Sequence, residues 1–306
     1  MNCDVSIIIV SFNTQQMTID CIKSVIEQTK QIDYELIVLD NNSSDGSVEA
    51  IVTEFPYINL IANKTNLGFA CGNNLAIREA KGKWVLLLNP DTVVLDHAID
   101  KLLSFAKSWG KEGIFGGRTY LGDGTFDPRS CWKKPSLWSV FCFALGLTAL
   151  FKRNVFFDSE SYGGWMRDTV RNVDIVTGCF LLLKKDTWSK LNGFSSDFFM
   201  YAEEADLCLR ALSIGVQPVI YPDAKIIHYG GASETIVADK MVRMLKSKVI
   251  LIHKHWNNKV SIRFGEYFYI IGAFIRGWNP VGVFYPSKKV IQWREIWARR
   301  NEWVYK

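Results

Sequence analysis

The sequence predicts an α/β fold with a mostly parallel sheet, helices on both faces of that sheet and a C-terminal helical extension. Over residues 5–88, short apolar runs alternate with segments of helical apolar spacing. The runs are continuously apolar, which is typical of parallel strands buried on both faces. Residues 236–306, in contrast, carry helical patterning without a strand-like run. A sheet domain followed by helices is therefore expected.

The first part of the chain supplies four strands and the helices between them. The expected strands are Val5–Val10, Leu36–Leu39, Ile58–Ile61 and Trp84–Leu88, and the expected helices are Gln16–Gln28, Ser47–Glu54 and Gly68–Ala80. Ligands of such sheets bind beyond the carboxyl ends of the strands. Functional residues are therefore expected in the loops that follow each strand.

The second part, residues 96–235, mixes both kinds of element. Helices are expected at Asp96–Ser108 and Glu203–Ser213, strands at Gly113–Arg118, Val173–Val176, Phe180–Leu183, Val216–Tyr221 and Lys225–Ile227, and a turn or loop at Leu121–Pro128. These patterns divide the chain into residues 1–95, residues 96–235 and residues 236–306, the last being the helical extension.

The composition is that of a globular protein, with 48% hydrophobic and 22% charged residues in a chain of 306. The N-terminus lacks a basic start and its apolar run is short, so no signal peptide is expected. The seven cysteines are odd in number and form no Cys-x-x-Cys pair. A disulfide framework or zinc site is therefore not expected, and the cytoplasm is the simplest setting.

The charge is unevenly distributed along the chain. Residues 236–306 carry a net charge of +10, so the preceding 235 residues carry −5. The tail also holds five Trp, and residues 135–151 form an uncharged run flanked by Lys and Arg. That run fits either a buried core helix or an interfacial helix, and the basic, Trp-bearing tail favours an anionic membrane surface. A homodimer contact is the alternative use of the tail.

A polar turn follows the second strand. Asp40 ends that strand and opens the segment Asp40-Asn-Asn-Ser-Ser-Asp-Gly-Ser47. Short polar residues and a glycine suit a tight turn into a helix, where backbone N–H groups and carboxylates meet a polar ligand. A helix-capping loop explains the same residues equally well.

Asn89-Pro90-Asp91-Thr92 follows the fourth strand. A carboxylate directly after a buried strand lies at the ligand edge of the sheet, where it could bind Mg²⁺ or Mn²⁺ beside a diphosphate. Taken alone, Asp91 could also be an ordinary turn residue after proline.

Three carboxylates, Glu203, Glu204 and Asp206, begin the helix Glu203–Ser213 behind the aromatic run at residues 198–201. Acidic residues are favourable at a helix N-terminus, which gives a purely structural reading. A partly buried carboxylate near others instead has a raised proton affinity and suits a general base. Arg210 is placed to pair with Asp206 across one helical turn.

His228-Tyr-Gly-Gly231 follows the strand pattern ending at Ile227. A histidine at a strand end before two glycines can bind metal or phosphate. By itself, a structural histidine is the better interpretation.

The order of these motifs strongly resembles glycosyltransferase family 2, whose members are inverting enzymes with the GT-A (Rossmann-like) fold. The resemblance runs from Val5 to about Gly231. Within the family the chain looks most like the bacterial rhamnosyltransferase branch. That narrower resemblance rests on Asn66-Leu-Gly-Phe-Ala, Asn89-Pro-Asp, Phe199-Met-Tyr-Ala-Glu-Glu and His228.

The resemblance implies a role for each part of the chain and for each motif. Residues 1–95 would be the nucleotide-sugar-binding half of the GT-A domain, and residues 96–235 would be its acceptor and catalytic half. Asp40 would contact the base or ribose of the donor, and Asp45 would support the same pocket. Asp91 would hold the metal, with His228 as a second metal or diphosphate contact. Glu204 would be the catalytic base and Asp206 a supporting carboxylate. The remaining donor-side residues would be Ser11, Asn13, Asn42, Asn66, Gly68, Asn74 and Asn89.

Two positions depart from the family pattern. The metal motif is usually Asp-x-Asp, and here it is Asn89-Pro90-Asp91, so one anionic ligand is missing. The base is usually the Asp of a Glu-Asp pair, and here it is Glu204, with Glu203 as the second candidate.

The implied activity is metal-dependent, inverting sugar transfer with Mg²⁺ or Mn²⁺ as cofactor. Rhamnose from dTDP-rhamnose is the expected donor group, and a UDP-sugar is the alternative. The expected acceptor is a hydroxyl of a lipid-linked or growing cell-surface glycan, which places the enzyme in the cytoplasm, peripherally on the inner face of the cell membrane.

Two other classes of protein are alternatives to a glycosyltransferase. A sugar nucleotidyltransferase would need a glycine-rich, basic loop after the first strand, where this chain has Ser11-Phe-Asn-Thr14. A non-catalytic nucleotide- or nucleic-acid-binding protein is opposed by the carboxylates at 203–206, since anions repel phosphate unless a metal intervenes. Nucleic acid is therefore not an expected partner.

Overall fold

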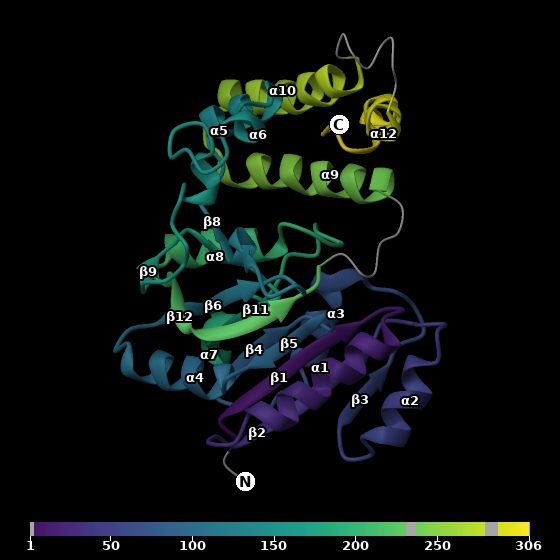
Figure 1. Cartoon of the computed structure of the whole chain (residues 1–306), viewed down its shortest axis with the longest axis vertical. Helices are drawn as coiled ribbons and strands as arrows, with labels where there is room; N and C mark the ends of the chain where they lie inside the picture. The colour runs from purple at the N-terminus through teal and green to yellow at the C-terminus, as the bar shows by residue number, and fades with distance from the viewer. Residues whose placement is uncertain (1–2, 231–236, 279–286, 306) are drawn as a thin grey trace. The chain divides into compact units, whose positions relative to one another are not determined.

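The computed structural model describes residues 3–230, 237–278 and 287–305 (Figure 1). The chain forms two compact units. The first contains residues 1–132, 166–199 and 203–233, and the second contains residues 133–165, 200–202 and 234–306. The boundary expected at residues 235 and 236, and Gly231, lie outside the described residues. Residues 133–165, which precede that boundary, belong to the second unit.

The N-terminal part of the first unit is a parallel sheet with strand order β3-β2-β1-β4. The strands are β1 (Val5–Ser11), β2 (Tyr34–Asp40), β3 (Asn59–Ala62) and β4 (Trp84–Leu88). Every residue of β1 and β4 is buried, as expected for continuously apolar strands covered on both faces. The loops after β1, β2 and β4 consequently leave the sheet at one edge.

The sheet continues from β4 with strands of mixed direction, in the order β11-β6-β12-β5. β11 runs antiparallel to β4 and β6, β12 runs parallel to β6, and β5 runs antiparallel to β12. These strands are β5 (Thr92–Leu95), β6 (Gly113–Tyr120), β11 (Phe180–Lys184) and β12 (Gln217–His228), and the short strands are β7 (Phe126–Asp127), β8 (Cys131–Trp132), β9 (Arg171–Asn172) and β10 (Ile175–Val176).

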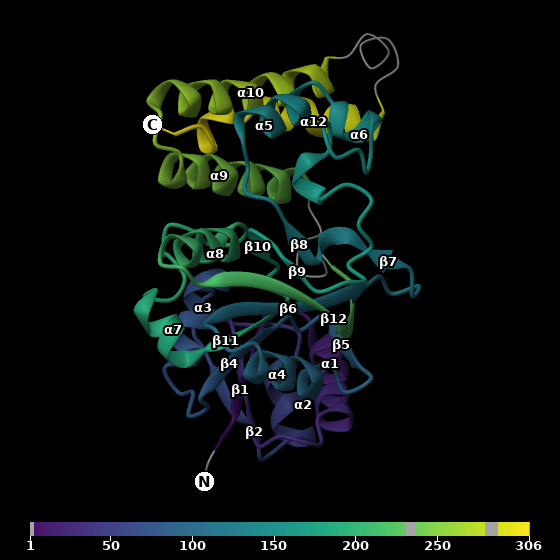
Figure 2. The same ribbon diagram turned by 90° about the vertical axis from the view of Figure 1, so that its left-hand side faces the viewer.

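Helices cover both faces of this sheet (Figure 2). Side chains of successive strand residues point to opposite faces, so Ile7 and Ile9 join a core with α1 and α4, while Val10 lies against Gly72 of α3. The predicted fold class is confirmed. The helices of this unit are α1 (Gln15–Gln28), α2 (Ser47–Glu54), α3 (Gly68–Ile77), α4 (Ala98–Ser108), α7 (Lys185–Lys190) and α8 (Glu203–Ser213).

Some element boundaries differ from those expected. The loop expected at Leu121–Pro128 contains β7, which pairs with β6. The two strand patterns around Pro222 form one strand, β12, because a register shift between Ile220 and Lys225 accommodates the proline. β5 was not predicted, since its four residues directly follow a turn motif and form too short a pattern to detect.

The second unit is helical and has its own core. α5 (Leu137–Ala144) packs on α10 (Lys259–Gly277), which also packs on α12 (Lys288–Ala298) and α9 (Val237–His255). A short helix, α6 (Leu147–Leu150), follows α5. Among the described helices, none is long and apolar enough to cross a membrane. The buried core of this second unit includes Val242, Leu245, Val249, Tyr269, Ile296 and Trp303.

Candidate functional site

Asp40 is the last residue of β2 and is only 1% exposed. Its Oδ2 atom accepts the backbone N–H of Ser43 at 2.9 Å, which closes the turn that follows the strand. Its Oδ1 atom is buried and has no hydrogen-bond partner within the described part of the chain. Since a buried acceptor without a partner is costly, this oxygen is a candidate to receive a donor from a ligand.

Asn41 ties this turn to the start of α3, and the sequence analysis missed it. Its Nδ2 donates to Asn66 Oδ1 at 3.0 Å and to the Gly68 carbonyl at 3.1 Å, and its Oδ1 accepts the Leu67 N–H at 2.9 Å. Asn66 and Gly68 are thus held beside the residue that follows Asp40. A signal was present, because Asn41 is the residue after Asp40 in the same motif.

Several predicted donor-side residues have partners within the protein. The Ser11 hydroxyl is buried and hydrogen-bonds with Thr14 and Thr18, so it faces the interior. Asn13 is exposed, and its Oδ1 accepts the Ser44 N–H at 2.8 Å. Asn42 is also exposed and adopts a positive φ of 69° in the turn. Asn13 and Asn42 thus shape the loop, while Ser11 supports it from beneath.

Asp45 and Asn74 also have structural roles. Asp45 accepts the N–H groups of Gln15 and Ser47; partial burial raises its pKa, but these hydrogen bonds outweigh burial and lower it. Asn74 pairs with both the N–H and the carbonyl of Phe194. These hydrogen bonds engage both side chains with other parts of the protein and not with Asp40.

Gly68 makes the closest backbone approach around this site. It has φ +76°, and a Cβ at Gly68 would lie 2.3 Å from the carbonyl oxygen of Phe199. The next residue, Phe69, donates its N–H to that same carbonyl at 2.8 Å. Only glycine meets both requirements here. The start of α3 is therefore held against the segment that leads to α8.

Asp91 and His228 come together beside Asn89. Asp91, 6% exposed, follows β4, and His228 is the last residue of β12. Asp91 Oδ1 lies 3.4 Å from His228 Nε2, and Asn89 Nδ2 lies 3.4 Å from the same nitrogen. The pairing of β12 with β5 places His228 opposite Thr92 and so fixes this arrangement.

The electrostatics of this pair favour charge on both members. Burial raises the pKa of Asp91, but the hydrogen bond and the charge of His228 outweigh it and lower that pKa. Burial lowers the pKa of His228, but the Cys179 and Asp91 side chains outweigh it and raise that pKa. The sequence analysis did not predict a role for Cys179 in the site. Its position directly after Thr177-Gly178 and before β11 was the available signal, because residues at the ends of strands lie at the edge of the sheet.

These residues fit a divalent cation that is shared with a substrate. Asp91 offers a carboxylate and His228 an imidazole. Asn89 offers a buried Oδ1 atom that has no hydrogen-bond partner among the residues that the structure describes. Among the described residues, no group of three His, Cys, Asp or Glu side chains forms a complete metal centre. Mg²⁺ commonly takes one or two protein ligands and completes its shell with substrate phosphates and water. The donor set fits that kind of binding.

The carboxylates Glu203 and Glu204 begin α8 as predicted. Glu203 is 4% exposed, and its Oε2 atom has no partner within the described chain. Burial, and then the neighbouring Glu204, raise the pKa of Glu203 well above its usual value. Burial raises the pKa of Glu204 to about 7, because two backbone N–H groups oppose it only in part. A half-buried carboxylate with such a pKa suits proton transfer near neutrality.

Asp206 has a different environment. It is fully buried and forms an ion pair with Arg210 at 2.8 Å, as the sequence predicts. Arg210 also donates to the carbonyls of Leu191 and Gly193. Asp206 therefore anchors α8 to the loop before it.

One turn links the carboxylates of α8 to the Asp91–His228 pair. A Cβ at Gly178 would lie 3.6 Å from the Glu204 Cβ atom. The next residue, Cys179, interacts with His228 through its side chain and accepts the Asn89 N–H on its carbonyl at 3.1 Å. Two successive residues thus touch Glu204 on one side and the candidate metal ligands on the other. Glu204 and the Asp91–His228 pair therefore form one candidate site within the first unit.

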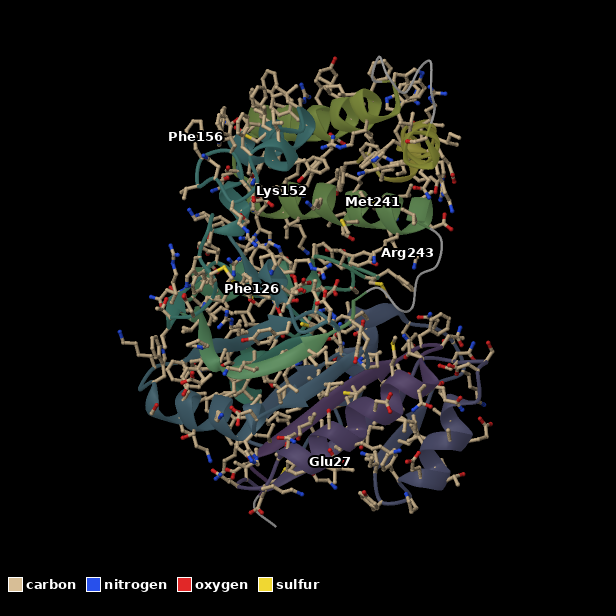
Figure 3. The ribbon with its side chains drawn as sticks, viewed as in Figure 1. Glu27, Phe126, Lys152, Phe156, Met241 and Arg243 are labelled. Carbon is tan, nitrogen blue, oxygen red and sulfur yellow. The ribbon has the colours of Figure 1, made fainter. Side chains whose placement is uncertain are left out.

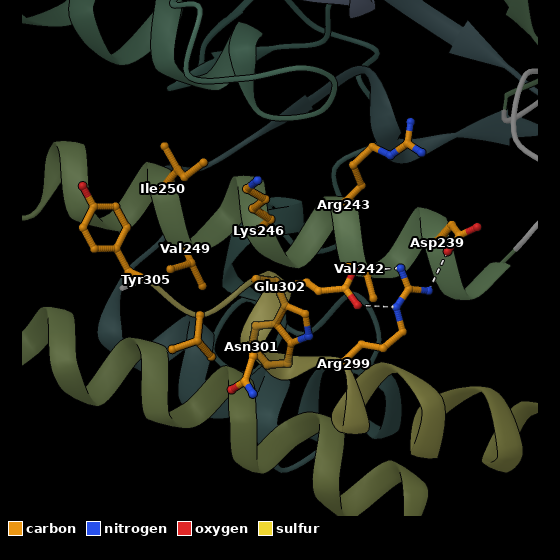
Figure 4. Close-up of a pocket in the computed structure, with 12 residues that line it drawn as sticks. Asp239, Val242, Arg243, Lys246, Val249, Ile250, Arg299, Asn301, Glu302 and Tyr305 are labelled. Carbon is orange, nitrogen blue, oxygen red and sulfur yellow. Dashed lines mark hydrogen bonds and ion pairs between the residues drawn. The ribbon is translucent and has the colours of Figure 1, made fainter.

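A groove of about 760 Å³ lies elsewhere, in the second unit (Figure 4). It is lined by α9 and by residues 299–305, and no residue predicted from the sequence lines it. Arg299 is paired there with Asp239 and Glu302. The candidate chemistry therefore lies outside this groove.

The chain is similar to known proteins both in sequence and in fold. Residues 6–173 match the model of glycosyl transferase family 2. Over 240 residues, the chain is 31% identical to the rhamnosyltransferase WbbL of Escherichia coli, with 74% of this chain and 83% of that protein covered.

A second relative is the N-acetylglucosaminyl-diphospho-decaprenol L-rhamnosyltransferase of Mycobacterium tuberculosis. The identity is 29% over 205 residues, covering 63% of this chain and 66% of that protein. A solved mannosyltransferase from Pyrobaculum calidifontis, in complex with GDP-Man and Mn²⁺, superposes with a TM-score of 0.59 at 14% identity, covering 99% of this chain and 86% of that one. This likeness supports the fold.

Proposed function

Because this chain belongs to glycosyl transferase family 2, we propose that it transfers a sugar from a nucleotide-sugar donor to an acceptor hydroxyl with inversion at the anomeric carbon. The observation that carries this proposal is the single site that joins Glu204 to Asp91 and His228 through Gly178 and Cys179. It combines a base of suitable pKa with ligands for a metal-bound diphosphate.

The nucleoside part of the donor binds at the turn after β2. The free Oδ1 of Asp40 accepts a hydrogen bond from the base or ribose, and Asn41 holds Asn66 and Gly68 against the same turn. The close approach at Gly68 places this turn against the segment that leads to α8. Binding energy here orients the diphosphate toward Asp91.

Mg²⁺ or Mn²⁺ would be held by a carboxylate oxygen of Asp91 and a ring nitrogen of His228, with Asn89 Oδ1 as a third contact, either direct or through water. Bound there, the cation supplies a Lewis acid that neutralises charge on the leaving nucleoside diphosphate. The pKa of His228 is raised, so its Nε2 atom must lose a proton before it can act as a ligand.

Glu204 takes the proton of the acceptor hydroxyl as that oxygen attacks the anomeric carbon. The new glycosidic bond forms as the bond to the diphosphate breaks, so the configuration inverts without a covalent sugar–enzyme intermediate. Glu203, whose pKa burial raises further, stays protonated beside it and limits the negative charge at the start of α8.

Rhamnose from dTDP-rhamnose is the proposed donor group, because two of the similar proteins are rhamnosyltransferases. One of those relatives is named for an N-acetylglucosaminyl-diphospho-decaprenol substrate, so a lipid-linked or growing cell-surface glycan is the proposed acceptor. A UDP-sugar is the alternative donor.

We also propose that the enzyme works peripherally on the inner face of the cell membrane. The Trp residues of the C-terminal tail, which favour a membrane surface in the sequence, are mostly packed within the second unit. Trp303 is buried, and Trp256 donates its Nε1 hydrogen to the Pro135 carbonyl. A different set supports the proposal, namely a stripe of exposed apolar residues along one face of α10. The α10 stripe consists of Val260, Phe264, Tyr267, Phe274 and Trp278.

Aromatic contacts connect the α10 stripe to exposed rings around α5. The ring of Phe264 lies 6.3 Å from Phe268, which lies 5.3 Å from Phe141, and Phe141 lies 5.5 Å from Trp138. Trp138 in turn packs on the exposed ring of Phe156 at 4.7 Å. The apolar surface therefore extends over two segments of the second unit.

Basic residues flank this apolar surface. Lys259 and Arg263 are exposed beside the α10 stripe, and Lys152 and Arg153 are exposed just before Phe156. Lys152 and Phe156 are labelled in Figure 3. Residues 133–157 contain no Asp or Glu. An apolar surface with a basic rim complements a bilayer that contains anionic lipids, whereas a second copy of the chain would bring like charges together.

The test of the transferase proposal is release of nucleoside diphosphate from a panel of dTDP-, UDP- and GDP-sugars with a lipid-linked acceptor. Release from one donor that depends on Mn²⁺ or Mg²⁺ and stops with EDTA is expected. Lack of release from every donor, combined with no metal-dependent nucleotide binding, would instead favour a non-catalytic binding protein.

A further inference from the structure

We propose that Arg129 binds a phosphoryl oxygen of the donor diphosphate and so completes the site opposite the metal ligands. This inference rests on the proposed function, since it assigns a ligand of that same site. Neither the sequence motifs nor the comparisons mark Arg129.

The backbone fixes the position of Arg129. It lies in the short turn after β7, and its N–H and its Nε both donate to Asp127 Oδ1, at 3.0 Å and 2.8 Å. Asp127 is 1% exposed and lies in register with Thr119 of β6. A buried carboxylate on a paired strand therefore holds one edge of the guanidinium, so little conformational entropy is lost when the other edge binds a ligand.

The other edge of the guanidinium points toward the candidate metal ligands. A Cβ at Gly230 would lie 3.7 Å from Arg129 Nη2 and 4.0 Å from His228 Cε1, so the two side chains flank the same small volume. Gly230 itself hydrogen-bonds through its backbone to Asp91. Arg129 is also close enough to Asp91 for their charges to interact.

The chemistry of this arrangement matches a diphosphate. Within the described residues, the Nη1 and Nη2 atoms of Arg129 make no hydrogen bond, and the side chain is 56% exposed. A guanidinium presents parallel donors that match two phosphoryl oxygens. Asp91 and His228 bind the diphosphate through a cation, whereas Arg129 contacts it directly, so the two contributions are separable.

The experiment is calorimetric titration of the full-length protein with the product nucleoside diphosphate, and separately with the nucleoside monophosphate, in Mn²⁺. For Arg129→Ala we expect nucleoside diphosphate affinity to fall about 10- to 100-fold, as for loss of a charge-assisted hydrogen-bond pair. Monophosphate affinity should change less than about twofold, because the nucleoside contacts remain. Arg129→Lys should be intermediate, since lysine keeps the charge and loses the paired geometry.

Arg78→Ala is the matched control, because Arg78 is exposed at the end of α3, away from these contacts. It should leave both affinities unchanged. The proposal is overturned if Arg129→Ala binds the diphosphate as the wild type does. It is also overturned if only the KM for a phosphate-bearing acceptor rises, because Arg129 would then bind the acceptor. Wild-type protein that binds no nucleoside diphosphate would remove the donor site itself, a failure distinct from either.

Discussion

Glu204 is the residue on which the proposed chemistry depends most directly. Replacing it with Gln keeps the size of the side chain and removes the base, so kcat should fall about 10²- to 10⁴-fold. Binding of nucleoside diphosphate should be unchanged. Steady-state kinetics and calorimetry measure the two effects, with the exposed Glu79→Gln as control. A larger loss in Glu203→Gln than in Glu204→Gln would transfer the role of base to Glu203.

The pH dependence of the wild-type enzyme follows from the same residue. Burial raises the pKa of Glu204 to about 7. Since the base must be ionised, kcat/KM should rise about tenfold per pH unit below 7 and level off above it. The profile should be measured from pH 5.5 to 8.5 at saturating metal. A flat profile below pH 7 would be inconsistent with Glu204 as the base.

The same raised pKa values carry a cost in stability. The folded state holds protons on Glu203 and Glu204 that the unfolded chain has released by neutral pH. The free energy of unfolding should therefore decrease as the pH rises from the usual range of Glu through about 7. Thermal unfolding of wild type and Glu203→Gln should converge at low pH, with the variant more stable at pH 8; equal slopes with pH would contradict this.

Sequence reasoning located the candidate chemical residues more readily than the residues that contact them. Asp40, Asp91, Glu204 and His228 follow strand ends or open a helix, which patterns reveal. Asn41 and Cys179 were missed because their roles come from residues distant in sequence. Ser11, Asp45 and Asn74 were proposed as donor ligands, and in the structure their polar atoms have protein partners.

Among the elements, α3 depends on a glycine at its first residue. Gly68→Ala would place a Cβ 2.3 Å from the Phe199 carbonyl, in addition to the strain of φ +76°. Gly110→Ala is a matched control, since Gly110 has φ +72° and nothing within 4 Å of its Cβ position. Both should lose about 1–2 kcal/mol from backbone strain, and Gly68→Ala about 1–3 kcal/mol more from the clash.

Chemical denaturation of both variants measures this difference, and nucleoside diphosphate binding should weaken in Gly68→Ala alone. Equal destabilisation of the two variants would mean that the contact with Phe199 relaxes at little cost. Periodicity predicted the helix itself; the clash that demands glycine arises from Phe199, which is far away in the sequence.

The elements that were hardest to predict are short ones. β7 has two residues, too few for a pattern to appear, and the four residues of β5 directly follow the turn motif at Asn89-Pro90-Asp91, which hides their pattern. The pairing of these strands depends on β12 and β6. The longer strands of residues 5–88 were predicted closely, because continuous burial forces an apolar sequence.

At the scale of the whole molecule, charge is segregated between parts of the chain, with +10 in residues 236–306 and −5 before them. The protein should co-sediment with phosphatidylcholine vesicles that contain phosphatidylglycerol, and binding should decrease as salt is added. Pure phosphatidylcholine vesicles should bind much less.

Phe264→Glu combined with Phe274→Glu tests whether the α10 stripe makes this contact. Vesicle binding should be lost. The control is Tyr57→Glu, which changes a still more exposed aromatic residue of the first unit and should bind normally. Normal vesicle binding by the double variant, or its conversion from dimer to monomer in analytical ultracentrifugation, would contradict the membrane assignment.

The hydrogen bond from Phe69 to the Phe199 carbonyl has a kinetic consequence. One end of this contact belongs to the loop that receives the nucleoside, and the other belongs to the segment that leads into α8. A donor that fixes the loop also fixes that segment, so the acceptor meets a completed site only after the donor has bound. Substrates should therefore add in a compulsory order, donor first, and the nucleoside diphosphate product should compete with the donor and not with the acceptor.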